Sequence, residues 1–174
     1  SSDQMQFNIG ELTNDGDIVS DGQITAAIDQ LTNTMTIQTG SELSLTVSDL
    51  NNSGTIISGE ELSIEAVTYN NSGGQLSNGA AKIDAESFSN SGQITANAAL
   101  QISGDQGVHT GVMVGYDSVE LSIKDYTQSG STVVLGDTLQ NHEVWTNSGQ
   151  TQVGGAHQIV AQSVNQLESA VVYS

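Results

Sequence analysis

The chain has no cysteine and no proline among its 174 residues. Without cysteine there is no disulfide framework, no thiol chemistry and no cysteine-bearing metal site. The absence of proline suits long, uninterrupted β-ladders, because a proline removes one hydrogen bond from a ladder. Aromatic residues make up only 4% of the chain. This scarcity argues against a large globular core and favours a thin one built from stacked aliphatic side chains.

Positive charge is also scarce. Lys82 and Lys124 are the only basic residues beside 20 acidic ones, and the net charge is −18. Phosphate contacts need a basic surface, so the composition excludes nucleic acid as a partner. Neither a signal peptide nor a long apolar run is visible, and we expect no direct membrane insertion. The acidic surface is expected to keep the chain soluble and to make copies repel one another.

What the sequence does contain is a fixed repeat. Residues 50–54 read Leu-Asn-Asn-Ser-Gly, and similar segments begin at residues 69, 88 and 145. The spacings are 19, 19 and 57 residues, and 57 is three periods of 19. A fixed period of this length is typical of solenoid architectures.

The 19-residue frame extends over most of the chain as columns of similar residues. One column is apolar at eight of nine positions, with Gly107 as the exception. Two residues later, polar side chains occupy every position, and six of these are asparagines predicted to form a structural ladder: Asn14, Asn33, Asn52, Asn71, Asn90 and Asn147. The other members of that column are His109, Gln128 and Gln166. Each amide can donate and accept, so stacked amides can bond to one another.

The second half of each unit alternates between apolar and polar residues, as Ile24, Ala26 and Ile28 show. Alternation with period 2 indicates strands. Short units of this kind bury a core only by stacking, with equivalent strands ~4.8 Å apart. The sequence therefore predicts an all-β fold: a right-handed parallel β-helix of about eight to nine 19-residue coils, forming a single segment over residues 1–174. The register is open at both ends, so we expect a fragment of a longer solenoid.

The repeat resembles that of filamentous haemagglutinin, most clearly in residues 50–66 and 88–102. Such repeats build the shafts of two-partner-secretion exoproteins of Gram-negative bacteria. These include adhesins and the toxin-delivery filaments of contact-dependent growth inhibition. The resemblance implies an internal shaft segment, secreted or at the bacterial cell surface, whose partners are neighbouring coils of the parent chain and a host or bacterial cell-surface receptor.

Acidic residues suggest two further sites. Residues 14–17, with Asp21, loosely resemble a calcium loop, although the repeat already explains Asn14 and Gly16. The frame also stacks Glu65 above Asp84, and stacked carboxylates can flank a glycosidic bond. Outward-facing acids on an acidic tube explain the same pattern. Long loops that would wall a substrate cleft have no room in this register. We therefore expect no enzyme activity, no catalytic residues, no metal site and no cofactor.

One coil departs from the pattern. Thr138, Gln140 and His142 stand where other coils have inward aliphatic residues. We expect a bulge or distortion here. With Trp145 nearby, the segment 136–147 is predicted as a partner contact through His142 and Trp145. A ligand-binding module centred on this segment is the main alternative to a structural shaft, and a polysaccharide-active enzyme is a further one.

Overall fold

The computed structural model describes residues 4–167 and 169–173, and every regular element in them is a β-strand. The long strands are β1 (Met5–Asn14), β3 (Ile24–Asn33), β5 (Leu43–Asn52), β7 (Leu62–Asn71), β9 (Ala81–Asn90), β11 (Ala99–His109), β13 (Ser118–Gln128), β15 (Asp137–Asn147) and β17 (His157–Gln166). The short strands are β2 (Asp17–Ser20), β4 (Thr36–Thr39), β6 (Thr55–Ser58), β8 (Gly74–Ser77), β10 (Gln93–Ala96), β12 (Val112–Gly115), β14 (Ser131–Val134), β16 (Gln150–Val153) and β18 (Val171–Tyr173). The described residues include no helix that could cross a membrane.

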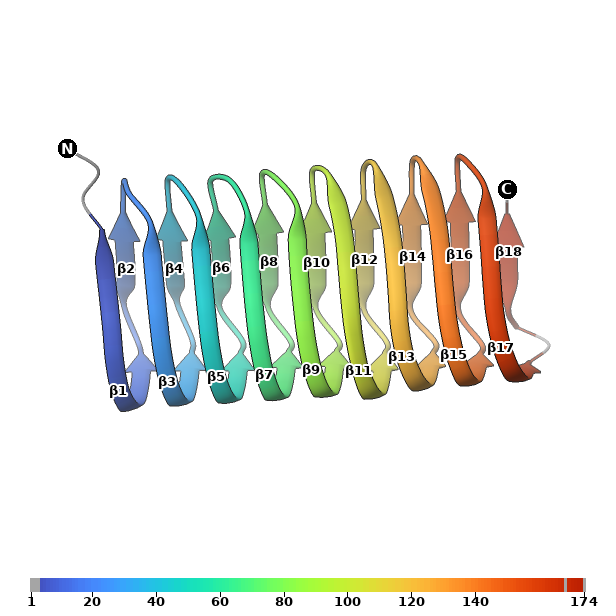
Figure 1. The fold of residues 1–174 in the computed structure, drawn as a ribbon, viewed down its shortest axis with the longest axis horizontal. Helices are drawn as coiled ribbons and strands as arrows, with labels where there is room; N and C mark the ends of the chain where they lie inside the picture. The colour runs from blue at the N-terminus through green and yellow to red at the C-terminus, as the bar shows by residue number, and fades with distance from the viewer. Residues whose placement is uncertain (1–3, 168, 174) are drawn as a thin grey trace.

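Long and short strands form separate parallel sheets. The nine long strands stack in chain order in one sheet, and the nine short strands stack in a second. Figure 1 shows the long strands running down the near side and the short strands running up the far side as the chain advances towards its C-terminus. The fold is therefore a right-handed parallel β-solenoid of nine coils, as the sequence predicts.

The register between coils is constant. From β1 to β17 every paired residue is matched with the residue 19 positions further on, as in Met5 with Ile24, Leu50 with Tyr69 and Asn71 with Asn90. β18 follows a longer connection and pairs Val171 with Gln150, 21 positions away. Nine strands at the usual spacing extend the solenoid by roughly 38 Å along its axis.

Each long strand bends at a corner. In β3 the side chains of Ile24, Ala26 and Ile28 point inwards, and then Asp29 and Gln30 are both exposed. Successive residues of a flat strand face opposite sides, so two exposed residues in a row mark a change of direction. The corner residue has no partner in register on the neighbouring strands. The cross-section thus has three sides: the two arms of a long strand and one short strand.

The core fills the tube with columns of like side chains. Leu31 and Leu50 are fully buried, and burial of a leucine contributes about 1.5–3 kcal/mol. The next rings in this column, Tyr69 and Phe88, stack with centroids 5.3 Å apart and planes 5° from parallel. Gly107 interrupts the column because a Cβ there would meet Ile123 and Tyr126 at 2.9–3.0 Å. Larger side chains of the next coil thus occupy the space that this glycine leaves.

The glycine of the Asn-Ser-Gly turn is required by close contact between coils. A Cβ on Gly73 would lie 2.0 Å from the carbonyl oxygen of Gly54, and one on Gly92 would lie 2.1 Å from that of Gly73. Neither glycine has a positive φ. The restriction is therefore steric, and it repeats at Gly54, Gly73, Gly92, Gly111, Gly130 and Gly149, whereas the second coil carries Met35 at this position.

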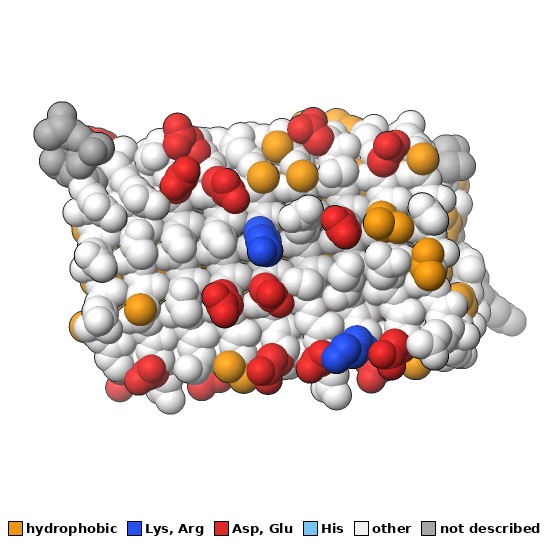
Figure 2. Space-filling model, in the orientation of Figure 1, with side chains coloured by type: hydrophobic (Ala, Val, Ile, Leu, Met, Phe, Trp, Pro, Cys, Tyr) orange, Lys and Arg blue, Asp and Glu red, His pale blue; other side chains and the backbone are white. Residues whose placement is uncertain are grey.

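Charge is distributed unevenly around the tube. Figure 2 shows the near side, where acidic side chains are scattered among neutral ones and surround the two lysines. Asp17 is the only charged residue on the described short strands. Between β4 and β16, the turns that precede the short strands carry no charged residue either. From β4 to β16, the short-strand side of the solenoid is therefore uncharged.

Two neighbouring glycines test the steric argument. Gly73→Ala is expected to lower the free energy of unfolding by at least about 2 kcal/mol, the scale of overpacking a well-packed site. Gly74→Ala should change it by less than about 1 kcal/mol, because its Cβ would meet only Thr55 side-chain atoms at 3.9 Å. Chemical denaturation of both variants measures the difference. Equal destabilisation would contradict the close-contact explanation.

Candidate functional site

The asparagine column forms a continuous chain of side-chain hydrogen bonds. The Nδ2 of Asn14 donates to the Oδ1 of Asn33, and the same bond links Asn33 to Asn52, Asn52 to Asn71 and Asn71 to Asn90, at 2.7–2.8 Å. All five side chains are at most 6% exposed. Each donor is directed towards the next coil, so the ladder has one direction along the axis.

The ladder also holds the backbone of the turn. Besides its neighbour's Oδ1, the Nδ2 of Asn14 donates to the carbonyl of Thr36 at 2.9 Å. The Nδ2 of Asn52 bonds in the same way to the carbonyl of Gly74, at 3.3 Å. Each amide therefore joins the end of its own long strand to the start of the short strand one coil further on. This arrangement satisfies buried polar groups that would otherwise be costly.

His109 continues the ladder with an imidazole ring. The Nδ2 of Asn90 can only donate, so the Nδ1 of His109, 3.1 Å away, accepts. The proton then lies on Nε2, which donates to the carbonyl of Ser131 at 3.1 Å. This neutral tautomer fits both contacts, whereas a second proton on Nδ1 would oppose the Asn90 donor. Burial lowers the pKa of His109 and so favours the same neutral form.

The ladder changes after His109. The Nε2 of Gln128 donates to the carbonyl of Gln150 and to the hydroxyl of Thr151, at 3.0 and 3.1 Å. The longer side chain of Gln128 thus bonds to the short strand of the next coil and makes no bond to Asn147. Asn147 accepts from the backbone N–H of Gly149 at 2.9 Å. Of the six predicted asparagines, five are joined to one another and Asn147 stands apart from them.

The irregular coil keeps its register. β15 pairs with β13 on one side and with β17 on the other at the same 19-residue offset. The expected bulge is therefore wrong. Thr138, Gln140 and His142 point into the tube and are at most 7% exposed. Polar residues replace aliphatic ones here without moving the backbone.

His142 and Trp145 belong to a buried stack. The His142 ring lies 5.1 Å from Tyr126 and 6.3 Å from Trp145, with planes within 19° of parallel. The Nδ1–H of His142 donates to the carbonyl of Ile123 at 2.6 Å. Trp145 is 2% exposed. Neither side chain projects from the surface, so their positions do not support the predicted partner contact.

This part of the core is the least well satisfied in its hydrogen bonds. Among the described residues, eight buried side-chain atoms have no hydrogen-bond partner in the protein. Six of them lie between residues 126 and 147: Tyr126 OH, Gln128 Oε1, Thr132 Oγ1, Gln140 Nε2, Trp145 Nε1 and Asn147 Nδ2. An unsatisfied buried polar group costs about 1–3 kcal/mol. Coils around β13 and β15 should therefore be the weakest of the solenoid.

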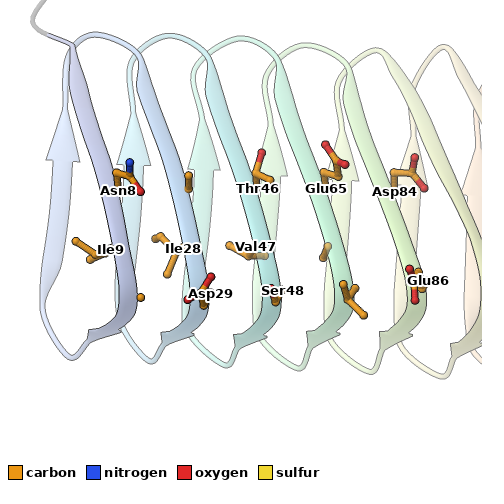
Figure 3. Close-up of a pocket in the computed structure, with 14 residues that line it drawn as sticks. Asn8, Ile9, Ile28, Asp29, Thr46, Val47, Ser48, Glu65, Asp84 and Glu86 are labelled. Atoms are coloured by element: carbon orange, nitrogen blue, oxygen red, sulfur yellow. The ribbon is translucent and has the colours of Figure 1, made fainter.

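The stacked carboxylates lie beside a shallow groove along the corner of the first five coils. Figure 3 shows its lining, in which Glu65 and Asp84 follow Thr46 along one row. Glu65 and Asp84 are partners in register on β7 and β9 and are exposed. The groove has a volume of about 650 Å³ and is lined by no basic residue and no histidine. Both carboxylates are exposed, and neither forms an ion pair among the described residues.

The other acidic candidates are also surface features. Asp15 accepts a hydrogen bond from the hydroxyl of Thr34 at 2.8 Å. No group of three or more His, Asp or Glu side chains with metal-binding geometry occurs among the described residues. Lys124 and Asp105 form an ion pair at 2.5 Å on the corner column. The hydrogen bond to Asp105 raises the pKa of Lys124, and an exposed pair of this kind contributes little to stability.

Comparison of the chain with known protein families, curated proteins and solved structures finds no match. The class that the fold defines is the parallel β-solenoid. The resemblance to the haemagglutinin repeat rests on the repeat residues themselves.

Substitution of two adjacent asparagines, one in the ladder and one on the surface, measures how much the buried ladder contributes to stability. Asn71→Ala should lower the free energy of unfolding by roughly 1–3 kcal/mol, because it leaves the buried Oδ1 of Asn90 without its donor and removes one of the acceptors of the Asn52 Nδ2. Asn70→Ala should cost less than about 0.5 kcal/mol, because Asn70 is exposed and bonds only to exposed Asn51. Thermal or chemical denaturation gives both values. Similar losses in the two variants would contradict the ladder.

His109 makes stability depend on pH. Its pKa is lowered in the folded state, so below about pH 6.5 the unfolded chain binds more protons than the folded one. The free energy of unfolding should therefore fall as pH falls, by at most about 1.4 kcal/mol per pH unit for one histidine.

The matched control is His109→Asn, which restores an amide to the column. Its stability relative to the wild type should rise between pH 7.5 and 5.5, while the contributions of the carboxylates and of the other two histidines cancel in the difference. A pH-independent difference would show that His109 titrates alike in both states.

Proposed function

We propose that the chain is a structural shaft segment of a secreted, cell-surface bacterial exoprotein, either a haemagglutinin-like adhesin or a contact-dependent toxin-delivery filament. Its task is to hold a binding or effector domain of the parent chain away from the surface. The role is mechanical and requires no active site, cofactor or metal. The observation that carries this proposal is the unbroken 19-residue register from β1 to β17.

The register supports a shaft for two physical reasons. Every coil adds the same rise, so the length grows in proportion to the number of coils. Two continuous nine-stranded parallel sheets resist bending, because a bend would break hydrogen bonds in both. The connections between long and short strands are only two or three residues from β1 to β17, which leaves no loops to build a substrate cleft.

The alternatives receive less support. A binding module centred on residues 136–147 needs accessible His142 and Trp145, and both are buried. A polysaccharide-active enzyme would use Glu65 and Asp84, which lie in an open groove without a basic residue. Assays for glycan binding, cell binding and polysaccharide cleavage test both. Cleavage that Glu65→Gln or Asp84→Asn abolishes would establish the enzyme, and specific binding by the isolated chain would overturn a passive role.

Deletion of a whole coil tests the shaft directly. Spin labels on cysteines at positions 13 and 127, six coils apart on the outer surface, should give one narrow distance near 29 Å. Removal of residues 50–68 deletes 19 residues and should shorten this distance by ~4.8 Å without loss of the fold. Removal of residues 50–59 breaks the register and should abolish the narrow distance. A broad distribution in the intact chain would contradict a stiff shaft.

A further inference from the structure

The uncharged side of the solenoid has the features of a self-association surface. The uncharged face is defined as the outward-facing residues of β4, β6, β8, β10, β12, β14 and β16 with the residue that follows each strand. It carries no Asp, Glu, Lys or Arg, although the chain has a net charge of −18. Several of its apolar side chains are exposed: Val112 is 40%, Tyr116 48% and Leu135 57% exposed.

The charge distribution selects this face for contact between copies. Any approach through the long-strand sheet or the acidic turns brings carboxylates of two copies together. Opposed like charges in an interface cost several kcal/mol. The uncharged face is the side of the described solenoid through which two copies can meet without that cost.

The order of side chains along the face is symmetric about β10. The central outward column reads Gln38, Ile57, Leu76, Thr95, Val114, Val133 and Gln152 from β4 to β16. Reversal of the column exchanges glutamine with glutamine and aliphatic residues with aliphatic residues, and leaves Thr95 in place. An isologous contact requires a surface that is complementary to itself in this way.

In the flanking columns, two bulky residues fall opposite glycines under the same reversal. Val112 falls opposite Gly74 of a second copy, because both lie one coil from β10 in the column before the central one. Leu135 falls opposite Gly59 in the column that follows. A parallel two-fold arrangement would exchange the two flanking columns and place Val112 opposite Tyr116, two bulky side chains.

We propose that the uncharged face binds a second copy of the chain, with the two solenoids face to face and antiparallel about a two-fold axis that passes through β10. Seven strands at ~4.8 Å and five residues at ~3.3 Å give a face of roughly 550 Å² per copy, or roughly 1,100 Å² in total, above the about 1,000 Å² that a biological interface should exceed. The pairing does not depend on the proposed shaft function. It would give a shaft twice the cross-section and greater stiffness.

Sedimentation velocity over a range of protein concentrations tests the pairing. The wild type should shift with concentration from monomer to dimer. Leu76→Glu with Val114→Glu places four carboxylates in the interface and should abolish the dimer. The matched control is Ser63→Glu with Gln101→Glu, which adds the same charge to the long strands of the same coils and should leave the dimer unchanged. If the double variant does not fold, Thr95→Glu tests the same interface with a single change on the two-fold axis and should also abolish the dimer.

A wild type that stays monomeric at all concentrations would overturn the proposal. So would a control that loses the dimer as fully as the double variant. Binding of a neutral polysaccharide by a chain that stays monomeric would assign the face to a different occupant.

Cross-linking determines the orientation, and the absence of native cysteine leaves a clean background. A short bis-maleimide should link Leu76→Cys chains to Val114→Cys chains in a mixture, and should link neither variant efficiently to itself. Efficient cross-linking of each variant to itself would overturn the antiparallel arrangement.

Discussion

The structure depends on hydrogen bonds between each strand and its equivalent one coil away. Because this register is constant, every side chain packs against the residues of its own column ~4.8 Å above and below. A column therefore favours residues that can pack against a residue of the same type in the coil above and in the coil below. Asparagine fits because its amide donates on one side and accepts on the other, as between Asn52 and Asn71. Glycine fits where the turns are so close that the Cβ of Gly73 would overlap the carbonyl of Gly54.

The same constraint explains why departures from the pattern come in groups. The side chains of Tyr126 and Ile123 occupy the space that a side chain at Gly107, one coil earlier, would need. The amide of Gln128 donates to the hydroxyl of Thr151 and makes no hydrogen bond to Asn147, whose Nδ2 has no partner. Thr138 and His142 bond to backbone carbonyls of the preceding coil, those of Val119 and Ile123. Each substitution changes what the next coil can carry, so polar residues accumulate around β13 and β15.

The 19-residue period predicts the fold and the columns, because a fixed offset determines which residues stack. It also places His142 in an inward column. The prediction of a bulge there was wrong, because the 19-residue register continues through β15. The polar residues of this coil are buried, and the imidazole stacks with the rings of Tyr126 and Trp145. The partner contact through His142 and Trp145 stays a prediction. The corner at Asp29 and the filling of the space beside Gly107 depend on the path of the chain in three dimensions, which no spacing in the sequence specifies.

Stacking also limits how a solenoid can carry a charge of −18. Two like charges ~4.8 Å apart repel by about 0.9 kcal/mol even in water, so a continuous column of carboxylates would be unstable. Several columns separate their acids, although Glu65 and Asp84 are direct neighbours. Asp49, for example, is followed in its column by Thr68, Ser87 and Gln106 before Asp125. Spreading them over all three sides would reduce the repulsion further. The short strands from β4 to β16 nevertheless carry none. Electrostatic relief within one chain does not explain this exclusion, whereas contact with another neutral surface does.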